Sequence, residues 1–226
     1  MDYVSVTAAI SIIAAGWAFF RIRARQQLAF IENFEFHPAL RKKVSDRYPH
    51  LSESQLTMVF RGLRTYFLIC NMAKRRIVAM PSQVVDVAWH EFILFTRTYQ
   101  QFSRKALGRF LHHTPTEAMR SQTMAQEGIK RAWRLSCAKE QINPNTPNKL
   151  PLLFAIDNEL GIEDGFRYVL NCQDKSHAGN NGSGDAYCAG HIACASGCSG
   201  SSGCAGDSVG SSCSGSSCSG GCGGGD

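Results

Sequence analysis

Hydrophobic residues recur with a helical period along most of this chain, and the alternation typical of strands is scarce. Residues 37–48 predict a short helix that Pro49 closes. The next predicted helix begins at a cap, Ser52 or Ser54, and ends near Met72. Its apolar positions follow one face, at Leu56, Val59, Leu63, Phe67 and Leu68. The pattern predicts an all-α fold.

The most aromatic stretch begins at Met80-Pro81-Ser82 and predicts one long helix to about Lys105, ended by Gly108. Its large apolar residues are Val85, Trp89, Phe92, Ile93, Phe95, Tyr99 and Phe102. Because aromatic side chains bury the most surface, we expect this helix at the centre of a bundle.

Three further helices complete the predicted bundle. Thr114-Pro115-Thr116-Glu117 matches a capping box with proline at the first helical position, and its helix should run to about Gln141. Residues 143–147 hold two prolines and indicate a linker. Shorter helices are predicted at 151–160 and 162–171.

The N-terminal segment is apolar on all sides. Residues 3–20 carry no charge, and Arg21, Arg23 and Arg25 follow directly. This length is just enough to span a membrane, and the aromatic end of the segment does not resemble a signal-peptide cleavage site. We predict an uncleaved single-pass transmembrane helix; the alternative is a buried core helix. The arginines place the N-terminus outside and the domain in the cytosol, against anionic headgroups.

Composition therefore divides the chain into three parts. Residues 1–25 are the predicted anchor with its basic flank, 26–172 a domain of about five to six helices, and 173–226 a tail. Residues 179–226 contain 15 Gly, 12 Ser and 7 Cys, with few large apolar side chains. Such a segment cannot offset its ordering entropy by burial, so a disordered Gly/Ser/Cys-rich coil is predicted.

Charge differs between the two ends of the chain. Residues 1–140 hold 21 Lys/Arg and 10 Asp/Glu, whereas residues 141–226 hold 3 and 8. A basic segment beside a predicted membrane helix matches anionic lipid. Nucleic acid is the weaker interpretation, because no nucleic-acid-binding motif is present.

Candidate chemistry lies in the aromatic helix and just after it. Asp86 and His90 are four residues apart, on one helical face, and His112 and His113 follow the break at Gly108. Three imidazoles and a carboxylate suit zinc or another first-row divalent ion, with Asp86 as a ligand or as the partner of a ligand.

Two other interpretations of these residues remain open. In the structural interpretation, His90 is hydrogen-bonded to Asp86, and the pair His112 and His113 caps helix ends around a buried Trp89. In the catalytic one, His90 acts as an acid or base. No nucleophile elbow or phosphate loop is present, and Cys70, Cys137 and Cys172 are interpreted as residues of helix faces.

The same region carries a family resemblance. The runs MPSQVVDVAWHEFIL (residues 80–94) and GRFLHHTP (108–115), with Tyr99 between them, resemble the glycine-rich domain-containing protein-like family. Its pattern is Val-Asp-x-x-Trp-His, an aliphatic helix with a tyrosine, a glycine and a closing histidine segment. Many members carry a second histidine where this chain has Phe92. The resemblance implies the fold and a focus on Asp86, Trp89 and His90, without a reaction.

The tail holds seven cysteines: Cys188, Cys194, Cys198, Cys204, Cys213, Cys218 and Cys222. No Cys-x-x-Cys pair occurs, so a folded zinc module is not expected. The alternatives are capture of zinc or copper(I) by mobile thiols, a passive low-complexity tail, and lipidation or other modification. After export, the same cysteines would form disulfides.

These features favour a non-enzymatic, membrane-anchored helical module that binds a protein partner at the cytosolic membrane face. The alternatives are a metal-binding protein or metal-dependent enzyme using Asp86, His90, His112 and His113, and a soft-metal or thiol reservoir in the tail.

Overall fold

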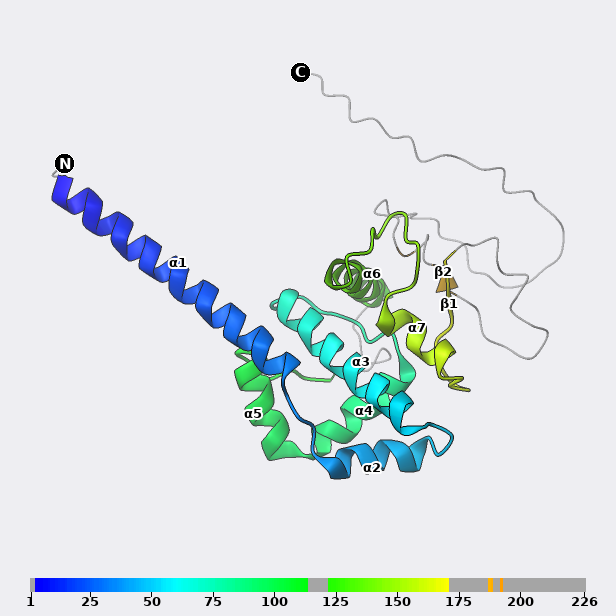
Figure 1. The fold of residues 1–226 in the computed structure, drawn as a ribbon. Coiled ribbons are helices and arrows are strands. Elements are labelled where there is room, and N and C mark those ends of the chain that lie inside the picture. The colour runs from blue at the N-terminus through cyan, green and yellow to red at the C-terminus, as the bar shows by residue number, and fades with distance from the viewer. Residues whose placement is uncertain (1–2, 114–121, 171–186, 189–191, 193–226) are drawn as a thin grey trace, which may run out of the picture. The chain divides into compact units, whose positions relative to one another are not determined.

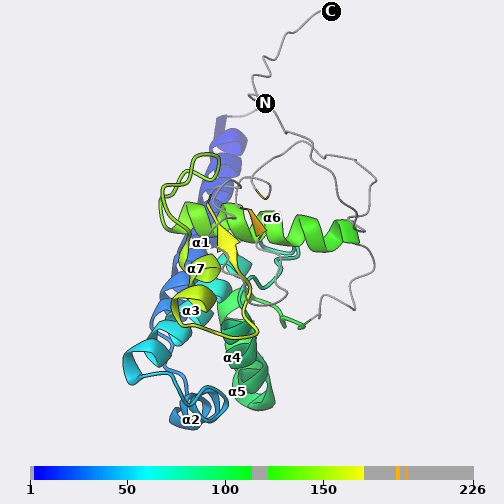
Figure 2. The ribbon, with the colours of Figure 1, turned by 90° about the vertical axis from the view of Figure 1, so that its right-hand side faces the viewer.

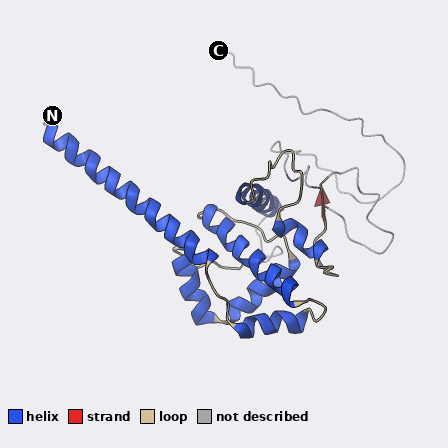
Figure 3. Ribbon diagram, viewed as in Figure 1, coloured by secondary structure: helices blue, strands red, loops and turns tan. Residues whose placement is uncertain are grey.

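A computed structural model describes residues 3–113, 122–170, 187–188 and 192. By its internal contacts the chain divides into two units, Met1–Ala195 and Ser196–Asp226, and the second lies outside the described residues. The described part contains seven helices and one pair of two-residue strands (Figure 3). The prediction of an all-α fold is confirmed.

Helix α1 (Tyr3–Glu32) is continuous, and its C-terminal end packs beside α5 (Figure 1). Ile31 is fully buried, and the Phe30 ring lies 5.8 Å from that of Phe102. Gln27 accepts a 3.1 Å hydrogen bond from Asn71. The predicted change from anchor to domain after residue 25 therefore falls within one helix.

The preceding part of α1 exposes its large apolar side chains, which include Ile10, Ile12, Ile13, Trp17, Phe19, Phe20 and Ile22. Among the helices of the described residues, none has both the length and the apolar character needed to cross a membrane. The transmembrane helix predicted for residues 3–20 is not confirmed.

Two predicted helices are present within a residue of their expected ends. These are α2 (Pro38–Arg47) and α3 (Glu53–Met72), and Ser52 caps α3 in a capping box with Gln55. Helix α3 contacts every other described helix. At Gly62 an added Cβ would lie 2.9 Å from Val85 Cγ2, so glycine permits the close approach of α3 and α4.

The predicted long helix from residue 82 is two helices, α4 (Gln83–Leu94) and α5 (Thr96–Leu107), which meet at Phe95. No glycine or proline marks the break. In one helix, Phe92 and Phe102 would lie about 15 Å apart along the axis. Their ring centroids are 5.3 Å apart instead. The prediction of one helix was wrong because folding at Phe95 buries these rings together.

Helix α6 (Gln122–Lys139) is seen nearly end-on in Figure 1 and side-on in Figure 2, where it runs across the direction of α4. The capping box predicted at 114–117 lies outside the described residues. The loop at 143–147 and α7 (Leu152–Glu159) agree with prediction. Trp133 of α6 is fully buried and donates a 3.1 Å hydrogen bond to the Pro144 carbonyl.

The helix predicted at 162–171 is absent. That segment is a turn followed by β1 (Tyr168–Val169), which pairs in parallel with β2 (Tyr187–Cys188). Gly165 lies so close to α7 that a Cβ there would be 2.7 Å from Asp157 Cβ. Ile192 is buried in the core, so part of the stretch predicted as coil from residue 173 belongs to the described fold.

The carboxylate of Asp157 holds the start of α4. Its Oδ1 accepts hydrogen bonds from Ser82 Oγ at 2.7 Å and from the Val84 amide at 3.2 Å. Its Oδ2 accepts from the amides of Gln83 at 2.7 Å and Phe166 at 2.9 Å. Burial raises the pKa of this carboxyl, and the four hydrogen bonds oppose that rise. Asp157 therefore joins α7, the turn after it and the first turn of α4.

Candidate functional site

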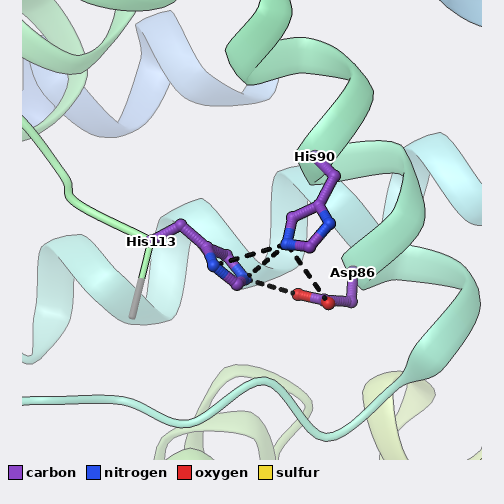
Figure 4. Close-up of side chains that lie close together, drawn as sticks. All are labelled: Asp86, His90 and His113. Atoms are coloured by element: carbon purple, nitrogen blue, oxygen red, sulfur yellow. Dashed lines mark hydrogen bonds and ion pairs between the residues drawn. The ribbon is translucent and has the colours of Figure 1, made fainter. Parts of the chain in front are cut away.

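Helix α4 carries two of the candidate ligands on one face. Ser82 caps the helix by accepting a hydrogen bond from the Val85 amide, which fixes the first turn that contains Asp86. His90 lies one turn later. Figure 4 shows both side chains pointing away from α4 toward His113, which comes from another segment.

His113 is brought to α4 by the turn after α5. Gly108, with φ of 69°, ends α5 and lets the chain reverse. The Tyr99 hydroxyl then donates a 2.6 Å hydrogen bond to the Leu111 carbonyl while it accepts one of 3.1 Å from Trp89 Nε1. The Trp89 ring also packs edge-on against the His113 ring, with centroids 4.5 Å apart. These contacts position the His113 imidazole over α4.

A second tie holds the same segment to the end of α3. Arg109 Nη2 donates a 2.8 Å hydrogen bond to the Lys74 carbonyl. Asn71, on the last turn of α3, donates to the Ala106 carbonyl at 2.7 Å. The segment that carries His113 is therefore fixed on both sides.

Asp86, His90 and His113 form one group (Figure 4), and their candidate ligand atoms all lie within 4.8 Å of one another. His113 Nε2 is 3.0 Å from Asp86 Oδ1 and 2.9 Å from His90 Nε2. His90 Nε2 is 3.6 Å from Asp86 Oδ2. We call these three residues the triad.

Hydrogen bonds alone do not satisfy these contacts. A ring nitrogen has a single in-plane bonding direction, used either by a proton or by a lone pair. His113 Nε2 nevertheless lies within 3.0 Å of both the Asp86 carboxylate and His90 Nε2. Two nitrogens on one tetrahedral zinc would be about 3.3 Å apart. The triad separations of 2.9 to 3.6 Å bracket that distance. His90 Nε2 also lies 3.3 Å from His113 Nδ1, so the His113 ring would have to turn about its side-chain bonds for each atom to direct a lone pair at one cation.

The triad lies in the wall of a cavity of about 430 Å³. The side chains are unequally exposed: 15% for His113, 23% for Asp86 and 52% for His90. The other lining residues are Tyr66, Cys70, Arg75, Arg76, Ile77, Val78, Ala79, Met80, Gln83, Trp89, Arg109, Leu111, His112 and Phe166. The cavity is of a size that holds small molecules.

The inner wall of the cavity is formed by α3. Burial raises the pKa of the Cys70 thiol to about 12, although the nearby Tyr66 hydroxyl and Arg109 charge act in the opposite direction. Burial also raises the pKa of Tyr66 well above its usual value, and its hydroxyl donates to the Val78 carbonyl at 3.1 Å. Cys70 is therefore a neutral thiol at physiological pH, as expected for a residue of a helix face.

The structure brings together three of the four predicted ligands. His112 also lines the cavity, but its ring lies 4.8 Å from Phe110 and it is not part of the triad. Ser82 and Gly108, rather than the histidine pair, cap the adjoining helix ends. Of the tail cysteines, Cys188 lies in β2, and the other six, like Cys172, lie outside the described residues.

The sequence reasoning missed four residues around the triad: Tyr99 as the support of Leu111, and the arginines Arg75, Arg76 and Arg109 in the cavity wall. The run Lys74-Arg75-Arg76 directly after a predicted helix was an available signal. Nothing in the chain order indicated that this run would face His113.

Comparison with known proteins identifies a family. A family model described as UCP032817-like matches residues 26–192. The match begins in the packed part of α1, ends at the buried Ile192, and includes the whole triad. No protein with a curated description and no solved structure matches the chain. The resemblance to the glycine-rich domain-containing protein-like family stays a prediction.

Proposed function

We propose that this chain, which belongs to the UCP032817-like family, binds a first-row divalent cation with Asp86, His90 and His113. The observation that carries the proposal is the convergence of a carboxylate and two imidazoles in the wall of a cavity. Two neutral imidazoles and one carboxylate are a frequent ligand set for such ions.

The ligand set also indicates what kind of metal site this would be. Structural zinc sites are closed by four protein ligands, most often with cysteine. The triad supplies three, and no fourth His, Cys, Asp or Glu joins it among the described residues. A bound ion would keep at least one position for water or another molecule from the cavity. We therefore propose a site that acts on, or senses, a small molecule.

The test measures Co²⁺ binding to the full-length chain by visible spectroscopy. The tail cysteines are first replaced by serine, because thiolates also bind such ions: Cys188, Cys194, Cys198, Cys204, Cys213, Cys218 and Cys222. One equivalent should bind with a spectrum of nitrogen and oxygen ligands. His90→Ala and His113→Ala should each weaken binding at least about 100-fold, since a ligand contributes more than a supporting partner.

His112→Ala is the matched control, because His112 lines the same cavity next to His113 but lies outside the triad. It should bind Co²⁺ as the parent does. Equal loss in all three variants, or no bound Co²⁺ in the parent, contradicts the proposal. If the unmodified chain binds metal only through thiolates, the reservoir in the tail is favoured instead.

A second proposal concerns the exposed part of α1. We propose that residues 3–25 attach the protein to a membrane that contains anionic lipid. The support is the exposure of Ile12, Trp17 and Phe20, at 72%, 62% and 71%, next to three arginines. Arg21 lies 4.6 Å from the centre of the Trp17 ring, an aromatic and cationic pair suited to the headgroup region.

Flotation with vesicles of phosphatidylcholine and phosphatidylserine tests this attachment. Deletion of residues 3–20 should abolish flotation, while the triple change of Arg21, Arg23 and Arg25 to glutamine should remove only the preference for phosphatidylserine. A deletion variant that still floats contradicts the proposal. Partner capture at the membrane, as a scaffold would require, presupposes this attachment.

A further inference from the structure

The geometry points to a phosphomonoester as the small molecule that occupies the cavity: its phosphate would fill the open position of the metal and contact Arg75, Arg76 and Arg109. This inference rests on the proposed metal site and names the class of ligand for it. The observation behind it is the placement of three arginines around the same cavity as the triad.

The charge of the cavity wall favours an anion. Among the described residues, Asp86 is the only acidic one that lines it, and with a metal bound its charge would be used as a ligand. None of the three arginines forms an ion pair with a described carboxylate; the ion pairs of the described residues involve other cations. Unpaired guanidinium groups around a divalent ion make a strongly positive site.

The number of donors favours phosphate over carboxylate. A carboxylate has two oxygens, which one bidentate arginine can satisfy. A phosphomonoester has three terminal oxygens and nearly two negative charges, so it can bind a metal and more than one guanidinium at once. Arg109 donates through Nη2 to the Lys74 carbonyl at 2.8 Å and through Nη1 to the Phe110 carbonyl at 3.5 Å, which leaves three of its five N–H donors for a ligand. Arg75 and Arg76 are exposed at the end of α3.

The remainder of the lining suits the organic part of such a molecule. Trp89, Leu111 and Phe166 contribute apolar surface to the same cavity. Phe166 is 39% exposed, so its ring is accessible from solvent. A volume of about 430 Å³ leaves room for an organic group in addition to the phosphate.

Calorimetry of the Co²⁺-loaded protein, with the seven tail cysteines replaced by serine as above, tests the inference with phenyl phosphate and benzoate as probes. Phenyl phosphate should bind at least about 10-fold more tightly than benzoate, and more tightly to the loaded than to the metal-free protein. The double variant Arg75→Ala/Arg76→Ala should weaken phenyl phosphate binding about 10-fold or more, with Co²⁺ affinity unchanged. The matched control, Arg97→Ala/Arg104→Ala, removes the same charge from exposed positions on α5 outside the cavity and should bind as the parent does.

Failure of the metal site would appear in the Co²⁺ spectrum before any phosphate is added, and it would overturn both proposals. If Co²⁺ binds but phenyl phosphate binds no better than benzoate, the phosphate inference alone is overturned. The same holds if the two arginine double variants lose affinity equally. Equal binding of phenyl phosphate with and without Co²⁺ also overturns it, because the phosphate would then not be a ligand of the metal.

Discussion

Two aspartates are found at the first turn of α4, Asp86 within it and Asp157 packed against it, and their surroundings differ. Asp157 is 2% exposed, and each of its oxygens accepts two hydrogen bonds from protein donors. Asp86 faces a cavity, and its side-chain contacts are with the imidazoles of His90 and His113. The first carboxylate has no remaining capacity to accept a hydrogen bond, whereas the second keeps lone pairs directed at an open space.

This difference separates a structural carboxylate from a candidate ligand. A buried carboxylate with four donors stabilises one arrangement of the chain, and removing any part of it leaves donors unsatisfied. A carboxylate with titratable partners in a cavity contributes little to folding and remains available to a cation. The two aspartates should therefore respond oppositely when stability and metal binding are measured.

The largest expected effect is on stability, in Asp157→Asn. The amide presents an NH₂ group to two of the four donors, so it loses two hydrogen bonds and places donors face to face. The free energy of unfolding, from urea denaturation, should fall by about 3 kcal/mol or more. Asp164→Asn is the control, because Asp164 is exposed and makes one long contact of 3.3 Å with the Gln83 side chain. A change below about 1 kcal/mol at Asp157 would show that its hydrogen bonds are replaceable.

The reciprocal prediction concerns Asp86→Asn. Its free energy of unfolding without metal should stay within about 0.5 kcal/mol of the parent, because the side chain is partly exposed. Its Co²⁺ affinity should fall about 100-fold, since a neutral amide oxygen is a weaker ligand than a carboxylate. If Asp86→Asn destabilises the protein as much as Asp157→Asn does, Asp86 also acts mainly to stabilise the fold, which contradicts the prediction.

Changing Tyr99, which supports the triad without belonging to it, should lower Co²⁺ affinity by a smaller factor. Tyr99→Phe removes the hydroxyl that joins Trp89 to the Leu111 carbonyl, so His113 should be held less firmly. Co²⁺ affinity should fall about 10-fold, with a stability loss of about 1 kcal/mol. Tyr66→Phe removes the hydroxyl of a buried tyrosine, which donates to the Val78 carbonyl and is also hydrogen-bonded with the Cys70 thiol. The Tyr66→Phe variant should lose a similar amount of stability and keep the Co²⁺ affinity of the parent. If Tyr99→Phe and Tyr66→Phe lose Co²⁺ affinity equally, Tyr99 does not position His113.

The fold was largely predictable because local signals and tertiary packing agree over most helices. Ser52 and Gln55 form the capping box of α3 from neighbouring positions, so the sequence alone indicates where that helix begins. The break at Phe95 was not predictable, because its cause is the contact between Phe92 and Phe102 across the turn. The helix predicted after Ile162 fails for a similar reason: Asp157, from another element, binds the Phe166 amide.

The sequence predicted the part of the candidate site whose residues are close together in the chain, and missed the part that only the fold brings together. Asp86 and His90 share a helix, so their spacing places them on one face. His113 joins them through a tyrosine and a glycine whose roles appear only in three dimensions, and His112 offered the same chemistry in sequence. Arg75 and Arg76, in the turn after α3, line the cavity together with Arg109, whose side chain joins the turn after α5 to Lys74.

The smallest predicted effect concerns Cys70 in the inner wall of the cavity. It tests whether this thiol is shielded from water, as Asp157 is, or reached by it, as Asp86 is. Burial raises the pKa of Cys70 from 9.0 to about 12. Above pH 9 the unfolded chain loses the thiol proton while the folded chain keeps it. The stability contributed by Cys70 is therefore fully present below pH 9 and is lost as the pH rises toward 12. Between pH 8 and pH 10 this one group should lower the free energy of unfolding by about 1 kcal/mol.

Cys70→Ala tests this contribution, because the other groups whose pKa values burial raises, Tyr48, Tyr66, Tyr99 and Cys137, remain in both proteins. The variant is expected to be less stable at every pH, so the measured quantity is the slope of the unfolding free energy against pH. That slope should be shallower in Cys70→Ala than in the parent between pH 8 and pH 10. Equal slopes would mean that the pKa of Cys70 is the same in the folded and unfolded chain, and that water reaches this thiol.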